Sequence, residues 1–267
     1  IRRRQAHSYA HGSSRAFVPL HNALGGGDIA QRIARATQHG FDGVAWSFER
    51  LASARASCEA NDCDLWSAYT VLDLGDGVEQ RLAPIYEAIT TLAGGPGMLW
   101  LGLQSPTHKP RDAAGDASAV RILRALLVKA DAAGVEIALY PHYGFWLETA
   151  ADAKRLCQRI QHPRLGVCFN LCHFLRNHTE TDPTAALRAC APQLFAVTIN
   201  GAKGTGDNWS ELIQPLGNGD FDLNGFLQTL DDVEFRGPVG LQAYGIRQAP
   251  AKHLPASMQA WRTAISR

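Results

Sequence analysis

Val135-Glu-Ile-Ala-Leu-Tyr-Pro-His142 decides the fold, because a short aliphatic run ends abruptly there in an aromatic ring, a proline and a histidine. Leu165-Gly-Val-Cys-Phe-Asn-Leu-Cys-His173 and Pro238-Val-Gly-Leu-Gln242 have the same design. Near-continuous apolar runs are typical of parallel strands that are buried on both faces. The sequence therefore predicts buried parallel strands whose polar ends lie at a binding site.

The rest of the chain alternates between strand-like and helix-like segments. Strands are predicted at Phe17–His21, Gly43–Ser47, Leu65–Val71, Met98–Gln104, Val135–Tyr140, Gly166–Asn170, Phe195–Asn200 and Val239–Ala243. Helices are predicted at Asp28–Gln38, Phe48–Asn61, Val78–Ala93, Asp116–Ala133, Leu147–Gln161, Pro183–Ala191, Asp222–Asp231 and Ala251–Ile265. Eight such pairs favour a single (β/α)8 TIM barrel of the α/β class, although an open doubly wound sheet has the same alternation.

The glycine-rich segments help to choose between these two folds. No Gly-x-Gly-x-x-Gly follows the first predicted strand, where a dinucleotide-binding sheet would carry it. Gly201-Ala-Lys-Gly-Thr-Gly206 follows the seventh strand instead. Barrels often bind phosphate near this point, and Lys203 could assist, but a surface loop is the simpler interpretation.

Composition limits the classes of partner. The chain of 267 residues is 46% hydrophobic and has 26 basic and 25 acidic residues. A charge near zero gives no reason to expect nucleic acid or an anionic membrane, and no apolar run approaches the ~20 residues of a membrane span. We expect a small-molecule partner, with a homo-oligomer possible. The six cysteines show neither zinc spacing nor the density of a disulfide scaffold.

The start of the chain bears on domain boundaries and compartment. We assign residues 1–15 to an N-terminal extension and residues 16–267 to the barrel. The chain begins at Ile1 and continues with Arg2-Arg-Arg4. The protein is thus expected in the cytoplasm or, if a signal peptide is removed upstream of residue 1, in the periplasm or outside the cell.

Several motifs together resemble one family. They are Gly40-Phe-Asp-Gly-Val44, Pro141-His142, Asn170-Leu-Cys-His173 and Gln214-Pro-Leu-Gly-Asn-Gly-Asp-Phe-Asp222. From about Phe17 onward the chain is similar to the xylose-isomerase-like TIM barrels, the sugar phosphate isomerase/epimerase superfamily. It is most similar to a subgroup from planctomycetes and related bacteria that also carries Phe-Asn-Leu-Cys-His and Gly-Leu-Gln.

The resemblance implies a metal site that this sequence departs from. Metal-dependent members carry Glu, Asp, His and Glu at the ends of strands five to eight, and the two Glu also move the proton. The matching positions here are Tyr140, Asn170, Thr198 (or Asn200) and Gln242. None of these brings a formal negative charge at neutral pH, so a hard cation would be held weakly or not at all. We expect no metal or other cofactor.

Two histidines remain as candidates for proton transfer. His142 and His173 follow the fifth and sixth strands, and imidazole can act as acid or base near neutral pH. A purely structural role for them is equally compatible with the sequence. A zinc site built from both and Cys172 is a weaker alternative.

Other polar and aromatic residues at strand ends are predicted to bind the substrate. They are Asn22, Gln104, Tyr140, Trp146, Asn170, Asn200, Gln242 and Tyr244, with His21, Trp46, Tyr69 and Trp209 also near strand ends. Amides can satisfy several hydroxyl groups and aromatic faces can stack on a sugar ring. We therefore expect a carbohydrate ligand. The leading hypothesis is His-mediated epimerisation, isomerisation or lyase chemistry on a sugar or keto-sugar; the alternative is a non-catalytic sugar-binding barrel.

Overall fold

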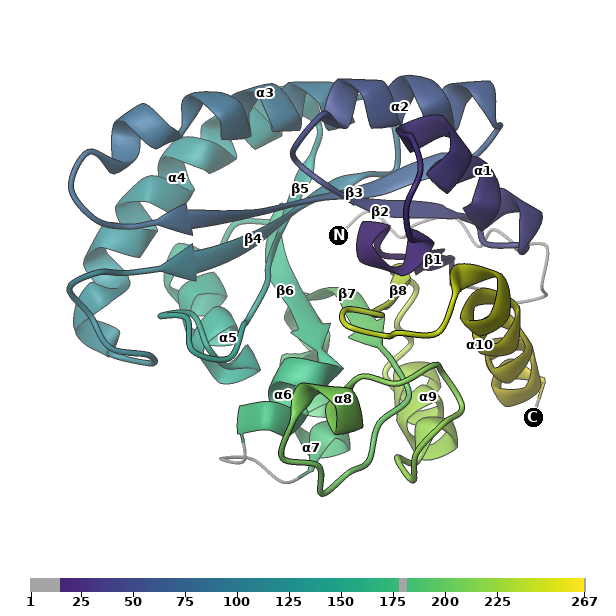
Figure 1. Ribbon diagram of the computed structural model, residues 1–267. Coiled ribbons are helices and arrows are strands. Elements are labelled where there is room, and N and C mark those ends of the chain that lie inside the picture. The colour runs from purple at the N-terminus through teal and green to yellow at the C-terminus, as the bar shows by residue number, and fades with distance from the viewer. Residues whose placement is uncertain (1–14, 178–181, 267) are drawn as a thin grey trace.

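The computed structural model describes residues 15–177 and 182–266, and Figure 1 shows eight strands surrounded by helices. The strands are β1 (Phe17–Pro19), β2 (Gly43–Ser47), β3 (Asp64–Asp73), β4 (Met98–Gln104), β5 (Glu136–Leu139), β6 (Leu165–Asn170), β7 (Leu194–Ile199) and β8 (Val239–Leu241). Every ladder between them is parallel. All eight predicted strands are present, with differences of a few residues at their ends.

The sheet is a nearly closed barrel with the order β1-β8-β7-β6-β5-β4-β3-β2. Between β1 and β2 the ladder is reduced to one parallel bridge, which joins Leu20 to Ala45. Asp42 reinforces this seam: its backbone N–H donates to the carbonyl of Phe17 at 3.1 Å, and its carboxylate accepts from the Phe17 N–H at 2.8 Å. The TIM-barrel prediction is therefore confirmed over the open doubly wound sheet.

The helices follow the strands around the outside of the barrel (Figure 1). Their bounds are α1 (Ile29–Gln38), α2 (Leu51–Ala60), α3 (Ala83–Leu92), α4 (Asp116–Ala133), α5 (Ala150–Ile160), α6 (Leu171–Asn177), α7 (Pro183–Cys190), α8 (Trp209–Leu212), α9 (Leu223–Asp232) and α10 (Pro250–Ile265), with 3-10 turns η1 (His21–Leu24), η2 (Val78–Arg81), η3 (Ala113–Gly115) and η4 (Ala191–Gln193). Reciprocal capping boxes start α1 at Asp28 and α5 at Thr149. The short helices α6 and α8 were not predicted.

The core has two parts, which together decide where a ligand can enter. Helix side chains pack against the outer faces of the strands, and a separate cluster fills the inside of the barrel. Inside, Trp100 and Tyr140 lie among small residues such as Ala138, Cys168 and Ala196, all of them buried. These side chains fill the inside of the barrel. The open end is therefore the one at the carboxyl ends of the strands, as in other barrels of this kind.

The N-terminal boundary is tested only in part. Residues 1–14 of the expected N-terminal extension lie outside the described residues. Arg15 is described, and its buried side chain pairs with Asp231 of α9. None of the helices in the described part of the chain is long and apolar enough to span a membrane.

Candidate functional site

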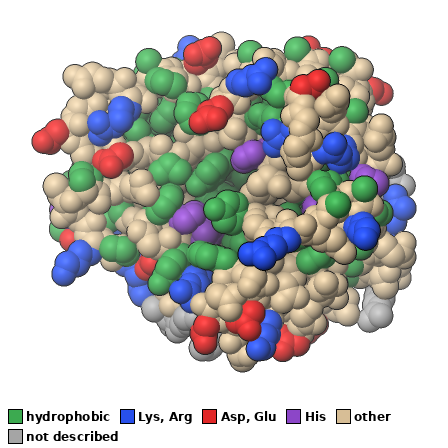
Figure 2. Space-filling view, in the orientation of Figure 1, with side chains coloured by type: hydrophobic (Ala, Val, Ile, Leu, Met, Phe, Trp, Pro, Cys, Tyr) green, Lys and Arg blue, Asp and Glu red, His purple; other side chains and the backbone are tan. Residues whose placement is uncertain are grey.

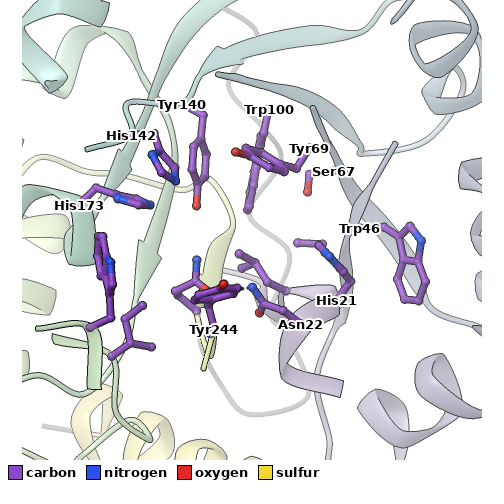
Figure 3. Close-up of a pocket in the computed structure, with 15 residues that line it drawn as sticks. His21, Asn22, Trp46, Ser67, Tyr69, Trp100, Tyr140, His142, His173 and Tyr244 are labelled. Carbon is purple, nitrogen blue, oxygen red and sulfur yellow. Dashed lines mark hydrogen bonds between the residues drawn. The ribbon is translucent and has the colours of Figure 1, made fainter. Parts of the chain in front are cut away.

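A cavity of about 510 Å³ opens at the carboxyl ends of the strands. In the face that Figure 2 shows, histidine and hydrophobic side chains lie near the centre, and charged side chains lie mainly toward the edge. Figure 3 shows the side chains that line the cavity. Its lining consists of Leu20, His21, Asn22, Ala45, Trp46, Ser67, Tyr69, Trp100, Tyr140, His142, His173, Trp209, Ile213, Gln242 and Tyr244.

His142 and His173 lie next to each other in one wall of this cavity (Figure 3). Their ring centroids are 3.8 Å apart and the ring planes are inclined by 38°. Phe145 stacks on the other face of His142 at 3.9 Å, and Trp209 meets His173 at 5.2 Å with its ring nearly perpendicular. Aromatic neighbours thus hold both imidazoles in place.

The peptide groups of Tyr143 fix which nitrogen of each imidazole carries hydrogen. The Tyr143 carbonyl oxygen lies 2.9 Å from His142 Nδ1, and a carbonyl only accepts, so His142 Nδ1 must donate. The Tyr143 N–H donates to His173 Nδ1 at 3.3 Å, so that nitrogen must be unprotonated. In the neutral rings, Nε2 of His142 is therefore an acceptor and Nε2 of His173 is a donor.

Both histidines are held in the neutral form. Burial lowers the pKa of His142, with partial compensation from the bond to Tyr143. Burial lowers the pKa of His173 well below the usual range, and the nearby His142 lowers it further. Near neutral pH the pair therefore combines an unprotonated base with a neutral N–H donor.

His173 reaches the cavity because it lies on α6, which starts directly after β6. No helix was predicted from the sequence at this position. Leu171, Phe174 and Leu175 have helical spacing, and Phe174 and Leu175 pack against the core. This spacing could have indicated the α6 helix, although a helical period is difficult to recognise in only seven residues.

An amide pair lies at the ends of β1 and β8. Gln242 Oε1 accepts from Asn22 Nδ2 at 2.9 Å and from the backbone N–H groups of Ala243 and Tyr244 at 2.9 and 3.0 Å. The Asn22 Oδ1 atom is buried without a hydrogen-bond partner among the described residues. Gln242 is thus fixed by its oxygen, and the pair has unused hydrogen-bonding capacity beside the cavity.

The four positions that the resemblance matches to metal ligands carry neutral side chains, and several of these are hydrogen-bonded within the protein. Asn170 Oδ1 already accepts from Thr198 Oγ1 at 2.9 Å and from Cys172 Sγ at 3.3 Å. Burial raises the pKa of the Tyr140 phenol well above its usual range. Gln242 Oε1 has three donors of its own. No described His, Cys, Asp or Glu side chains gather in a group of three or more that could hold a metal ion.

Four of the eight predicted substrate-binding residues and the adjacent His21 reach the cavity, together with both candidate catalytic histidines. Tyr140, Gln242, Asn22 and Tyr244 line it with His142 and His173. Asn170 is near but lines a small recess behind His173 instead.

Three further predicted substrate-binding residues are not among the residues that line the cavity. Asn200 faces a second hollow near α9 and α10, where its Nδ2 donates to the carbonyls of Gly201 and Leu212 at 2.8 and 2.6 Å. Trp146 is buried, and its Nε1 donates to the Asp112 carbonyl at 2.8 Å. Gln104 ends β4 outside the set of lining residues. The structure therefore gives these three side chains no contact with the cavity.

Two alternatives from the sequence also receive no support from geometry. Lys203 Nζ lies 3.4 Å from the carboxylate of Glu211, and the Gly204 N–H donates to the carboxylate of Asp220 at 2.7 Å. The ammonium and N–H groups of this loop are therefore engaged by carboxylates of the protein itself. Cys172 is buried and its Sγ donates to Asn170 Oδ1 at 3.3 Å. These contacts give no support to a phosphate-binding loop or to a zinc site.

Sequence reasoning missed part of the cavity floor. Ser67 Oγ and Trp100 Nε1 are buried without a hydrogen-bond partner among the described residues, and both residues line the cavity. Ser67 and Tyr69 alternate along β3, so a period of two would have placed both on the inner face. Trp100 also belongs to the core inside the barrel, where its ring stacks near Tyr140 at 5.9 Å.

Comparison with known families gives one match over most of the chain. The model described as "Xylose isomerase-like TIM barrel" matches residues 33–264. No curated protein sequence matches the chain significantly.

Solved structures with the same fold include sugar epimerases. The apo form of 3-keto-D-glucoside 4-epimerase YcjR from E. coli superposes with a TM-score of 0.75 at 19% identity, covering 93% of this chain and 99% of that one. L-ribulose 3-epimerase gives a TM-score of 0.75 at 13% identity, covering 94% and 95%. D-allulose 3-epimerase from Methylomonas sp., in complex with D-allulose, gives 0.67 at 16%, covering 96% and 93%. At these identities the likeness is one of fold.

Proposed function

The chain belongs to the xylose isomerase-like TIM barrel family, and we propose that it binds a sugar or keto-sugar and moves a proton on a carbon next to its carbonyl. The observation that carries this proposal is the fixed pair of opposite tautomers on His142 and His173. The sugar epimerases among its structural neighbours support a carbohydrate as the ligand.

In the proposed step each histidine has one role. His142 Nε2 takes the proton from the carbon next to the carbonyl, and the electron pair of that C–H bond moves to the carbonyl oxygen. The Nε2–H of His173 donates to this oxygen as its negative charge develops, which is the kind of stabilisation that oxyanion donors provide. Delivery of the proton from His142 to the former carbonyl carbon, with transfer of the neighbouring hydroxyl proton to the oxygen that received the electron pair, completes an isomerisation without any net oxidation. Protonation of the original carbon from its opposite face would give the epimer instead.

The proposed reaction needs no metal ion. In related metal-dependent barrels the cation would polarise the carbonyl, but here the positions that match its ligands are neutral side chains whose oxygens are engaged within the protein. We propose that His173 takes over the polarising role. Dialysis against a strong chelator should then leave turnover and thermal stability unchanged, and a loss of activity that added Mn²⁺ restores would overturn this part of the proposal.

The alternative function is sugar binding without catalysis. The same aromatic and amide lining serves a binding protein, so the two functions differ only in whether a carbon-bound proton exchanges. Histidine neutrality and opposite tautomers favour the enzyme, because a binding site has no need for an unprotonated base beside a neutral donor.

Proton exchange is the measurement that separates the two functions. The protein is incubated in D₂O with free ketoses, aldoses and ring-keto sugars, and NMR follows deuterium at the carbon next to the carbonyl as well as new stereoisomers. We expect deuterium incorporation together with product. Binding in a thermal-shift screen with no exchange for any bound keto-sugar would establish the non-catalytic alternative, and a lack of binding to every sugar would refute both.

A further inference from the structure

We propose that Cys58 and Cys63 form an oxidation-sensitive dithiol, in which a hydroperoxide oxidises Cys63 first and Cys58 then closes a reversible disulfide. The site lies between the carboxyl end of α2 and the amino end of β3, and it does not depend on the proposed function. Three observations lead to it: the backbone turn that joins the two cysteines, the contact between their thiols, and the exposure of Cys63.

The turn after α2 is of a kind that brings the side chains of residues 58 and 63 together. Asp62 is left-handed, with a φ of 48°, and follows the C-cap Asn61. The Cys63 N–H donates to the Cys58 carbonyl at 3.0 Å, and the Asp62 N–H donates to the Glu59 carbonyl at 3.4 Å. These two hydrogen bonds make a Schellman motif, in which the side chain just past the turn commonly packs against one in the last turn of the helix. Both of these positions are cysteine here.

The two thiols are hydrogen-bonded to each other. This bond, together with burial, raises the pKa of Cys58. The same bond lowers the pKa of Cys63, against the opposing effects of burial and of the neighbouring Asp64 and Asp62. Cys58 is therefore the donor and Cys63 the acceptor, which favours a thiolate at Cys63. Since the thiolate is the nucleophilic form of cysteine, Cys63 is the residue that reacts first.

Cys63 is also the cysteine that a small oxidant can reach. It is half-buried, whereas the other five cysteines are buried. Burial raises the pKa of Cys157 to about 12, and it raises the pKa values of Cys168 and Cys172 as well. Buried thiols of this kind are inert, whereas a partly exposed thiolate beside a second thiol is typical of oxidation-sensitive pairs.

The proposed reaction has two balanced steps. The Cys63 thiolate attacks one oxygen of hydrogen peroxide, so that an S–O bond forms, the O–O bond breaks, and the other oxygen leaves as water after taking up a proton. The Cys58 sulfur then attacks the sulfur of the resulting sulfenic acid, the S–S bond forms, and the hydroxyl leaves as water with the Cys58 proton. Two thiols are thus oxidised to one disulfide while one peroxide is reduced to two water molecules.

The turn holds the two cysteines in position for this bond. The hydrogen bond from the Cys63 N–H to the Cys58 carbonyl fixes the backbone at both ends of the turn, and the thiols already touch. The sulfur atoms need only approach from this contact to the length of a disulfide, about 2.05 Å. The disulfide closes a loop of six residues, from 58 to 63. Because a short loop restricts the unfolded chain only a little, oxidation should stabilise the fold slightly.

The test measures which thiols hydrogen peroxide oxidises in the folded protein. Remaining thiols are alkylated in denaturant, and mass spectrometry identifies the tryptic peptides, of which residues 56–81 contain both cysteines. We expect this peptide to lose two hydrogens and both alkylation sites about tenfold faster, or more, than any of the other four cysteines is oxidised. Dithiothreitol should restore both thiols. The oxidised protein should unfold at a temperature a few degrees higher than the reduced protein.

Single variants separate the two roles. In Cys58→Ser, Cys63 should accumulate as a sulfenic acid that dimedone traps. In Cys63→Ser, the peptide should stay reduced, and peroxide should no longer shift the unfolding temperature. Cys157→Ser is the matched control, because Cys157 is likewise a buried helix cysteine, and it should leave the disulfide between residues 58 and 63 unchanged.

Two kinds of result would overturn the inference. Wild-type protein that stops at the sulfenic acid, or that forms a dimer linked through Cys63, would show that Cys58 does not close the disulfide. Equal oxidation rates for all six cysteines, or oxidation of Cys58 in Cys63→Ser, would show that Cys63 is not the reactive thiol. None of these outcomes bears on the proposed function, which the deuterium-exchange assay tests by itself.

Discussion

The imidazoles of His142 and His173 lie 3.8 Å apart, and one residue, Tyr143, sets their hydrogens in opposite senses. The Tyr143 carbonyl requires a hydrogen on Nδ1 of His142, and the Tyr143 N–H excludes one from Nδ1 of His173. Because burial also lowers both pKa values, two chemically identical neutral side chains present opposite hydrogen-bonding groups, an acceptor on His142 Nε2 and a donor on His173 Nε2. Similar side chains in different environments are a common basis for acid and base assignments in enzymes.

Replacement of His142 by Asn tests the base. The Asn amide nitrogen lies near the position of imidazole Nδ1, so it can still donate to the Tyr143 carbonyl, but no base remains at the position of Nε2. We expect deuterium exchange into the substrate to fall by about 10²–10⁴-fold, the usual contribution of a general base. His39→Asn is the control, since His39 caps α1 outside the cavity. Exchange that survives in His142→Asn would assign the base elsewhere.

Two replacements of His173 separate its donor from its acceptor. In His173→Gln an N–H group lies near the position of Nε2 and can donate to the carbonyl oxygen. In His173→Asn the side-chain oxygen can still accept from the Tyr143 N–H, but no donor reaches the ligand. We expect kcat to fall by about 10²–10³-fold in the Asn variant and distinctly less in the Gln variant. The reverse order would show that His173 acts through Tyr143 and only positions His142.

Stability should decrease on the acid side of neutrality. Burial lowers the folded-state pKa values of His21, His142, His173 and His253 below the ordinary value of about 6.5. Below that pH the unfolded chain binds more protons than the folded chain, so the free energy of unfolding falls as pH decreases through this window and levels off below the folded-state pKa values. Denaturant unfolding between pH 8 and pH 5 measures the slope, which His173→Gln should reduce. A slope of the opposite sign would mean that the histidines gain protons on folding.

The fold was predictable because its information is local. Each buried strand of a parallel barrel is a short apolar run, and Gly134 in a left-handed conformation ends α4 where a helix stop was expected. The α6 helix was not predictable to the same degree, since it begins at Leu171 without a turn after β6. The helix was therefore not predicted, although His173 was expected at the correct end of the barrel.

The site was less predictable, because a strand end has several directions in which a side chain can point. Asn200 follows β7 by one residue, and that offset turns it toward α9 and α10 instead of the cavity. Trp146 is of a residue type that can stack on a sugar ring, but it is buried and its indole N–H donates to the Asp112 carbonyl. Residue type and approximate position cannot distinguish these outcomes, since hydrogen bonds to the backbone of a distant segment decide them.

The final prediction concerns Gln242, whose side-chain oxygen holds together the end of β8 and the first loop of the barrel. In Gln242→Leu the Asn22 amide and the N–H groups of Ala243 and Tyr244 lose their acceptor. A buried donor left without a partner costs about 1–3 kcal/mol, so the free energy of unfolding should fall by at least that amount.

Gln242→Glu is the matched variant, because a carboxylate accepts the same three hydrogen bonds. Its oxygens would be stabilised by these donors, which lower a carboxyl pKa, while burial at a position 5% exposed opposes ionisation. We therefore expect Gln242→Glu to destabilise the fold less than Gln242→Leu near neutral pH. Its deficit should grow as pH falls and the carboxylate takes up a proton. Equal losses in the two variants, measured by denaturant unfolding, would show that side-chain shape at β8 matters more than the three hydrogen bonds.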